Sequence, residues 1–305
     1  MDNPGSTRPP PLESMRNQPI VSRFILIEPS HAGNVGAVAR ALKVMGFADL
    51  VLVRPRWADV LQRPEALERA SGAADVLAAA RVCATLDEAL GGITHLCATA
   101  MTARDFGPPT LAPREHLGAW VQAQRAAPAA AHGVAFVFGP ERYGLSNGDV
   151  YRCHASLRIP TSPGYGSLNL AAAVQLIAYE WRLALGGFEP HTNDRAGDRA
   201  HDRAGQHTDD RAIDHTDDRP DQLPGAPAPT PRNAADTPAD AATVAAALAH
   251  WQEALVALQY LDPAAPKKLL PRLQQLLNRA QPTLAEIHIL RGVARAVLRL
   301  AQTKG

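Results

Sequence analysis

Apolar residues along the first 188 positions follow two alternating patterns. Short continuous apolar runs, typical of buried strands, occupy residues 24–27, 50–53, 95–98 and 134–138, and a shorter candidate lies at 157–160. Between them, apolar residues recur every three or four positions and predict helices near residues 34–46, 64–71, 72–80, 86–91, 113–126 and 168–186. Strands that alternate with helices are typical of a mostly parallel sheet with helices on both faces, so we expect an α/β fold.

The last part of the chain, from residue 241 to 305, carries only the helical pattern. Leu248, Trp251, Leu255 and Leu258 have helical spacing within 241–261, and five leucines between 269 and 277 predict a second helix. A third helix is expected to begin at Thr283, because Thr283 and Glu286 fit a capping box in which each side chain caps the other residue's backbone N–H. We therefore expect a small all-helical unit at the C-terminus.

A segment of different composition separates the two regions. From residue 189 to 240 the triplet Asp-Arg-Ala recurs at 194, 198, 202 and 210, and a run rich in Pro and Ala follows. The spacing of four suggests an arginine-striped helix, but Gly197, Gly205 and the later prolines favour a solvated, disordered linker. The predicted organisation is a disordered tail at 1–20, an α/β domain at 21–188, a linker at 189–240 and a helical extension at 241–305.

The net charge does not indicate a binding partner, but the distribution of charge in the C-terminal region is informative. The 31 basic and 30 acidic residues leave a formal net charge of +1, so composition does not indicate a polyanion partner. Arg291, Arg295 and Arg299 lie four apart in the third C-terminal helix, and more basic residues stand nearby at 267, 268, 272 and 279. The two interpretations of this helix face, a solvated surface and a contact with a phosphate backbone, stay open at about equal weight.

The remaining composition indicates a cytoplasmic protein. Cys83, Cys97 and Cys153 are far apart and lack the spacing of a zinc site, so we expect buried thiols in a reducing compartment and no metal. The N-terminal residues lack the apolar core of a signal peptide, and no apolar run is long enough to span a membrane.

Three loops carry residues suited to binding a ligand: 28–36, 138–147 and 162–170. Gly33 and Gly36 allow close approach of the backbone, and a helix start favours a polar ligand. Glu141 and Arg142 follow an apolar strand, at the sheet edge where α/β proteins bind ligands. In the third loop, an ordinary helix start, with Ser167 as N-cap and Asn169 in the first turn, explains the residue types without catalysis.

A dinucleotide site is a competing interpretation of the first loop. Gly33 and Gly36 give only GxxG rather than GxGxxG, and the next strand ends at Arg54 instead of an acidic residue. A Rossmann-like small-molecule enzyme therefore remains only a weak alternative.

Taken together and in this order, the three loops resemble the SPOUT (SpoU/TrmH-type) superfamily of RNA 2′-O-ribose methyltransferases, most closely the TrmJ-like tRNA (cytidine/uridine-2′-O-)-methyltransferases. Residues 34–40 match motif 1, 138–147 motif 2 and 167–170 motif 3, and Thr102-Ala103-Arg104 resembles a further family signature. The resemblance covers the first strand through Trp181 and resumes at 269–297, where Asn278-Arg279-Ala280 and Ile289-Leu290-Arg291-Gly292 look like the family's C-terminal extension.

The resemblance implies a trefoil-knotted α/β domain, a homodimer whose partner completes each active site, S-adenosyl-L-methionine as methyl donor and tRNA as substrate. It implies catalytic roles for Asn34, Arg40, Ser167 and Asn169. It assigns the methyl donor to Thr99, Met101, Thr102, Gly139, Glu141, Ile159, Ser167 and Leu168. It assigns RNA contacts to Arg104, Arg142, Arg291, Arg295 and Arg299.

The reaction implied is methyl transfer to a ribose 2′-hydroxyl, expected at the cytidine or uridine that begins the anticodon loop. Because an arginine rarely gives up its proton, we expect Arg40 to stabilise the developing oxyanion, with the proton passing to a phosphate oxygen or water.

Two features depart from the family pattern. Pro140 stands where members often carry Arg or Asn, and the insert after Phe188 is unusual. A SPOUT-like protein that binds RNA without catalysis is a further alternative, although Asn34, Arg40 and Asn169 are all present. The base preference, the tRNAs used and the role of the insert do not follow from the sequence.

Overall fold

The computed structural model describes residues 20–126, 133–188 and 237–303. All but the last residue of the predicted tail at 1–20, and nearly all of the predicted linker, lie outside these ranges. None of the helices in the described ranges is long and apolar enough to cross a membrane.

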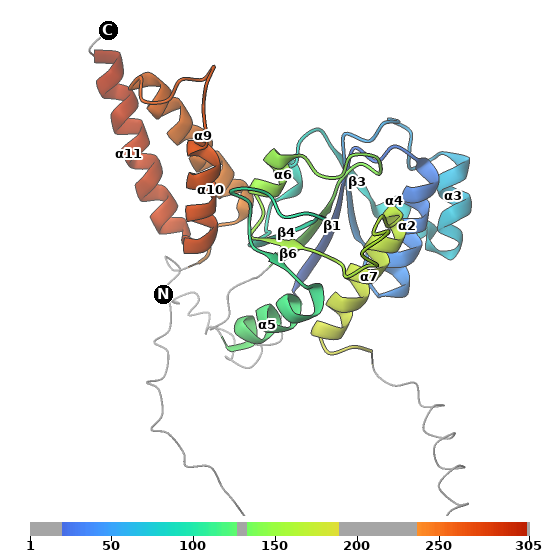
Figure 1. Cartoon of the computed structure of the whole chain (residues 1–305). Helices are drawn as coiled ribbons and strands as arrows, with labels where there is room; N and C mark the ends of the chain where they lie inside the picture. Colours follow the sequence, from blue (N-terminus) through green and yellow to red (C-terminus); the bar gives the residue numbers. More distant parts are fainter. Residues whose placement is uncertain (1–19, 127–132, 189–236, 304–305) are drawn as a thin grey trace, which may run out of the picture.

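Residues of the first two described ranges form one parallel sheet of seven strands (Figure 1). The strand order is β3 (Arg81–Cys83), β2 (Asp49–Val53), β1 (Val21–Ile27), β6 (Gly133–Phe138), β4 (His95–Thr99), β7 (Ala155–Leu157) and β5 (Thr110–Leu111). Each neighbouring pair is parallel. The carboxyl ends of β1, β6, β4 and β7 are therefore adjacent at one edge, which confirms the predicted α/β class.

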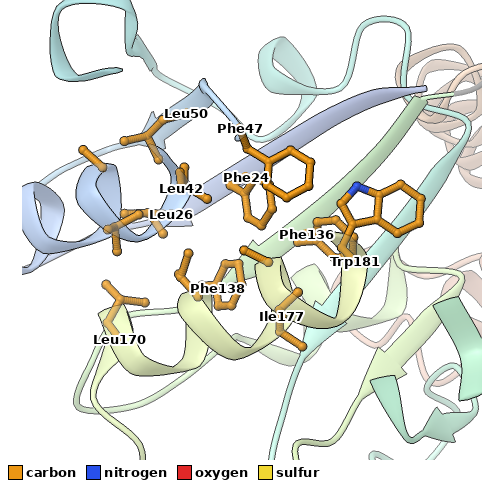
Figure 2. Packing of buried hydrophobic residues seen from close by; sticks show 14 of the residues in the cluster. Phe24, Leu26, Leu42, Phe47, Leu50, Phe136, Phe138, Leu170, Ile177 and Trp181 are labelled. Carbon is orange, nitrogen blue, oxygen red and sulfur yellow. The ribbon is translucent and has the colours of Figure 1, made fainter. Parts of the chain in front are cut away.

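One face of the sheet is covered by five helices: α2 (Ala32–Val44), α3 (Pro64–Ala70), α4 (Ala74–Ala79), α5 (Pro113–Ala126) and α7 (Leu170–Ala184). Figure 2 shows the rings of Phe24, Phe136 and Trp181 packed together, with centroids 5.1 Å apart between the phenylalanines and 5.6 Å apart between Phe136 and Trp181. The indole N–H donates to Ser22 Oγ over 2.8 Å, so the one polar atom of this buried ring is satisfied.

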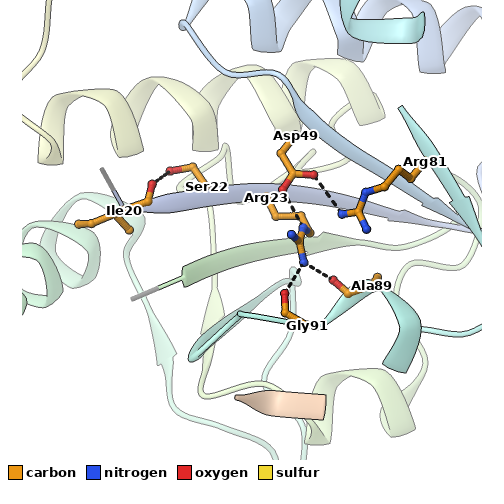
Figure 3. A network of polar contacts seen from close by, with 7 residues as sticks. All are labelled: Ile20, Ser22, Arg23, Asp49, Arg81, Ala89 and Gly91. Carbon is orange, nitrogen blue, oxygen red and sulfur yellow. Dashed lines mark hydrogen bonds and ion pairs between the residues drawn. The ribbon is translucent and has the colours of Figure 1, made fainter. Parts of the chain in front are cut away.

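The opposite face is covered by fewer elements: the short helix η2 (Asp87–Ala89), α6 (Asn147–Tyr151) and the first residues of α9 (Ala241–Ala257). Arg23 fixes η2 to the sheet, as Figure 3 shows, by donating to the carbonyls of Ala89 at 2.7 Å and Gly91 at 2.9 Å and to Asp49 at 2.8 Å. Because both faces are buried, the strands are continuously apolar: Phe24 and Leu26 pack on one side, and Ile25 and Ile27 on the other.

The C-terminal helices α9, α10 (Leu269–Ala280) and α11 (Leu284–Thr303) form a separate unit beside α6 (Figure 1, orange to red). Val244, Ala247 and Ile287 form its small core. The predicted capping box is confirmed, because Thr283 N donates to Glu286 over 2.7 Å and Glu286 N donates to Thr283 Oγ1 over 3.3 Å.

This unit is attached to the α/β domain by specific polar contacts. Asn278 Nδ2 donates to the carbonyl of Cys153 at 2.8 Å, and Asp240 accepts from the backbone N–H of Gly92 at 3.0 Å. Pro238 forms a β-bridge with Thr283, so residues 237–240, at the end of the predicted linker, belong structurally to the helical unit.

Several predicted elements differ from the structure. The strand predicted at 157–160 is wrong beyond Leu157, since β7 spans 155–157 and Pro160 lacks a backbone donor. The helix predicted at 86–91 is only the short 3₁₀ helix η2. Strands β3 and β5 were not predicted, because they have only three and two residues and too little apolar pattern to be recognised.

Candidate active site

Loops that follow three neighbouring strands, β6, β4 and β7, enclose a cavity of about 330 Å³ at the carboxyl edge of the sheet. It is lined by Thr99, Ala100, Met101, Thr102 and Arg104 after β4, by Phe138, Gly139, Pro140, Glu141, Tyr143, Gly144 and Leu145 after β6, and by Leu157, Ile159, Ser167, Leu168, Leu170 and Ala173 from β7 into α7. This size suits a small organic ligand. All residues that the sequence analysis assigned to the methyl donor line this cavity, although their role as ligand contacts stays a prediction.

The second loop is a tight turn whose shape requires glycine. Gly144 N donates to the carbonyl of Pro140 over 2.8 Å, and Gly144 has a φ of +68°, which glycine adopts without strain. A Cβ on Gly139 would collide with the backbone of Gly144 and Leu145. The turn therefore presents Glu141 and Tyr143 from a closely packed backbone.

Gly36, which the sequence analysis interpreted as allowing a ligand to approach, has a different function in the described structure. A Cβ at this buried position would collide with the backbone of Ala66 in α3. Gly36 thus permits the close packing of α2 on α3.

A polar network joins the three loops. Glu141 accepts from Asn34 Nδ2 at 2.9 Å, from Ser30 Oγ at 2.6 Å and from Ser30 N at 3.0 Å. Asn169 Nδ2 donates to Asn34 Oδ1 over 3.2 Å. Burial raises the pKa of Glu141, but the hydrogen bonds from Asn34 and Ser30 outweigh it and hold the pKa at about 2, so the carboxylate is ionised at neutral pH.

Asn169 has two roles in this arrangement. Its Oδ1 accepts from Ala171 N over 2.9 Å, so Asn169 is the N-cap of α7, whereas its Nδ2 contacts Asn34. The assignment of Ser167 as N-cap is therefore wrong. Ser167 lines the cavity instead.

Arg40 lies apart from this group. It is exposed, six residues beyond Asn34 on α2, and the described residues offer its guanidinium neither a hydrogen bond nor a carboxylate. Six residues correspond to about 600° of helical rotation and about 9 Å of rise, so the two side chains leave different faces of α2. A single chain does not bring Arg40 to the cavity.

The residues assigned to RNA contacts fall in two places. Arg104 lines the cavity and donates to Thr102 Oγ1 over 2.9 Å, and Arg142 lies exposed with its guanidinium 5.3 Å from the Tyr143 ring. Arg291, Arg295 and Arg299 lie on α11, far along the chain in the C-terminal unit.

Two residues of this region were not predicted as site residues. Ser30 makes two hydrogen bonds to Glu141 and lies shortly after β1. It belongs to the predicted loop 28–36, but no role was predicted for it. Tyr143 lies within the second loop, and its exposure at the cavity was not predictable from residue type. A polar residue within three positions of the end of a central parallel strand was the available signal for Ser30.

Three residues with metal-ligand chemistry meet outside the cavity. The ligand atoms of His95, Cys97 and His116 lie within 4.8 Å of one another. The two histidines face each other through their Nε2 atoms at 3.0 Å, and burial lowers the pKa of both. The expected absence of a metal stays a prediction.

Comparison with known proteins agrees with this geometry. A family model described as the SpoU rRNA Methylase family matches residues 22–179, and one described as the C-terminal domain of the tRNA methyltransferase TrmJ matches residues 242–305. A fold and a cavity of this kind, together with the first match, define the class of SpoU-type RNA methylases.

Relatives over most of the chain define the group more narrowly. The chain is 34% identical to the tRNA (cytidine/uridine/adenosine-2′-O-)-methyltransferase TrmJ of Pseudomonas aeruginosa, covering 92% of this chain and 95% of that protein. It is 35% identical to the tRNA (cytidine/uridine-2′-O-)-methyltransferase TrmJ of Salmonella typhimurium, covering 90% and 95%. The chain belongs to the TrmJ group of the SpoU methylase family.

Solved structures show the same similarity. TrmJ from Zymomonas mobilis superposes with a TM-score of 0.66 at 28% identity, over 91% of this chain and 99% of that one. A probable methyltransferase from Bordetella pertussis has a TM-score of 0.50 at 48% identity, over 54% of this chain and 96% of that one.

Proposed function

We propose that this protein is an S-adenosyl-L-methionine-dependent tRNA 2′-O-ribose methyltransferase that acts on the cytidine or uridine at the start of the anticodon loop. The observation that carries the proposal is the Glu141–Asn34–Asn169 network, which joins the three family loops at the edge of the cavity. A tRNA substrate also implies a cytoplasmic location.

The cavity fits the methyl donor in its chemistry. Thr99 Oγ1 is buried beside the cavity with no hydrogen-bond partner in the described residues, so a polar ligand atom would satisfy it. The backbone of the 139–144 turn is open to the cavity, and Leu145, Ile159 and Leu168 supply apolar walls for an adenosine. When bound, the donor supplies an electrophilic methyl group on a sulfonium sulfur.

The chain's own residues would orient the ribose. The Asn34 amide is held at both ends, donating to Glu141 and accepting from Asn169, so its rotamer is fixed before substrate arrives. The ionised Glu141 anchors this amide. Arg40 would stabilise the negative charge that develops on the 2′-oxygen, while a phosphate oxygen or water takes the proton.

Dimerisation would bring Arg40 to a site, since a single chain does not. Leu176, Tyr179 and Leu183 leave 40–44% of their surface exposed at helical spacing on α7. An apolar helix face of this kind supports a homodimer packed through α7, with Arg40 completing the partner's site. The trefoil knot is proposed from family membership alone.

The decisive experiment is methyl transfer to unmodified tRNA. Purified protein, tritiated donor and a tRNA transcript should give incorporation, and mass spectrometry of nuclease fragments should locate a 2′-O-methyl group. A transcript with a 2′-deoxynucleotide at that position should accept none. Binding of tRNA and donor without incorporation would favour the non-catalytic alternative.

A further inference from the structure

Tyr143 is an aromatic side chain at the cavity with most of its surface in solvent. It lines the cavity, yet 76% of the residue is exposed, whereas the other aromatic lining residue, Phe138, is 2% exposed. Tyr143 therefore contributes little to the packing of its own chain. Its ring is available to a ligand that reaches beyond the cavity.

The backbone that carries this ring is held in place. The Gly144 N–H to Pro140 carbonyl bond closes the turn just after Tyr143, and Ser146 then caps α6 by accepting from Asp149 N at 3.2 Å. An exposed ring on a fixed turn loses little conformational freedom on binding, because only its side-chain torsions remain to be ordered.

The surroundings of the ring favour a nucleotide. Glu141, two residues earlier in the same turn, bonds to Asn34, where the ribose is proposed to lie. The Arg142 guanidinium lies over the ring, 5.3 Å from its centroid, and offers a cation for a neighbouring phosphate; a base would stack on the other face of the ring or displace the guanidinium. Base and ribose are covalently joined, so a ribose at Asn34 carries its base toward this side of the cavity.

We propose that Tyr143 is a stacking platform for the base of the target nucleotide, an inference that rests on the proposed tRNA methyltransferase function. Proteins read single-stranded RNA loops by stacking splayed bases on aromatic side chains. Every base has a π-face, so such stacking tolerates changes of base identity. Stacking on Tyr143 would let the site accept either cytidine or uridine, because it needs no hydrogen bond that distinguishes the two bases.

The test compares Tyr143→Ala, Tyr143→Phe and Tyr143→Trp in the full-length protein, with Tyr165→Ala as the matched control. Tyr165 is 79% exposed in the loop before α7, but it does not line the cavity. Tyr143→Ala should lower kcat/KM for tRNA by roughly 5- to 100-fold, the range that loss of base–aromatic stacking gives. Tyr143→Phe, Tyr143→Trp and Tyr165→Ala should stay within about threefold of the wild type, because each keeps an aromatic ring at position 143.

A fluorescent base gives a direct reading of the stacking. Pyrrolocytidine at the target position of the tRNA, bound in the presence of S-adenosylhomocysteine, should be quenched by the wild type and by Tyr143→Phe but not by Tyr143→Ala. The affinity for S-adenosylhomocysteine, measured by calorimetry, should be equal in all variants.

Four results would overturn the inference: wild-type kinetics for Tyr143→Ala, a loss in Tyr143→Phe as large as in Tyr143→Ala, a matching loss of S-adenosylhomocysteine affinity, or a changed oligomeric mass in light scattering. The last two would make Tyr143 a wall of the donor site or a subunit contact. If the wild type transfers no methyl group to tRNA, the proposed function fails. If it does and Tyr143→Ala matches it, only the platform fails.

Discussion

Glu141 is the residue through which the three loops of the site are joined. It accepts hydrogen bonds from Ser30 and Asn34, and Asn34 in turn holds Asn169. Because these donors bind the ionised carboxylate more strongly than the neutral acid, the carboxylate and the loop arrangement stabilise each other. The protonation state of Glu141 is therefore coupled to the stability of the site.

This coupling predicts a pH dependence. The pKa of Glu141 is about 2 in the folded protein, below its ordinary value of 4.5, so its contribution to stability is complete above about pH 5 and is lost as the pH falls toward 2. The free energy of unfolding of the wild type, relative to Glu141→Gln, should decrease by roughly 1 kcal/mol between about pH 5 and about pH 3.5. Urea unfolding of both proteins measures this difference, and a constant difference would contradict it.

Substitutions of Arg40 test whether its positive charge or the planar shape of its guanidinium is required for turnover. If positive charge alone stabilises the oxyanion, Arg40→Lys should keep most of the turnover and Arg40→Ala should abolish it. Equal loss in both variants would show that the planar guanidinium itself is required. Because Arg40 is exposed and does not line the cavity, donor affinity measured by calorimetry should be unchanged in both.

At the level of residues, the sequence predicted more of the lining of the cavity than of the polar network beside it. Gly139, Glu141 and Ser167 were recognisable because three loops occur in a set order, and all three line one cavity. The double role of Asn169 was not predictable. The cap uses Oδ1 and the contact with Asn34 uses Nδ2 of the same amide, and only the approach of α2 to α7 shows that both occur.

At the level of elements, long buried strands and amphipathic helices were predicted, and short edge elements were not. The four central runs lie within β1, β2, β4 and β6, where burial on both faces makes most positions apolar. β3 and β5 sit at the two edges of the sheet and are held by their neighbours rather than by their own pattern. Strand order follows from contacts distant in sequence, so periodicity could not provide it.

The junction between α10 and α6 gives a prediction at this scale. Asn278 is 7% exposed and donates to the carbonyls of Tyr151, Arg152 and Cys153 at the end of α6. Asn278→Leu would leave these carbonyls without that donor and should destabilise the protein by about 1–3 kcal/mol. Denaturant unfolding should detect the loss, with Arg279→Ala, an exposed change on the same helix, as an unaffected control.

The whole molecule combines a cavity at the sheet edge with a helical unit attached to the thinner face of the sheet. The first residues of α9 pack against the core on that face. The C-terminal unit therefore covers part of the sheet and also has a small core of its own. Because α11 packs on α9 and α9 packs on the sheet, the basic face of α11 is connected to the α/β domain through α9. If the predicted RNA contacts of the α11 arginines are right, one tRNA would contact both units.

Replacing Arg291, Arg295 and Arg299 together by Ala tests this role in the full-length protein. If each guanidinium contacts a phosphate, tRNA affinity should fall and the slope of log affinity against log salt should decrease by about 2–3, because fewer counterions are released. The donor affinity should not change, since none of these residues lines the cavity.

A control variant with the same change of net charge at other positions shows whether tRNA binds the arginine face of α11 or responds only to the overall charge of the protein. Arg69, Arg81 and Arg125 are exposed on α3, β3 and α5, so their joint replacement by Ala removes three positive charges without altering α11. If RNA binds through the α11 face, this control keeps nearly the wild-type salt slope, because long-range fields are screened beyond about 10 Å at moderate salt. Equal losses in the two triple variants would mean that tRNA responds to overall charge, and the helical unit would then contribute to stability rather than to RNA recognition.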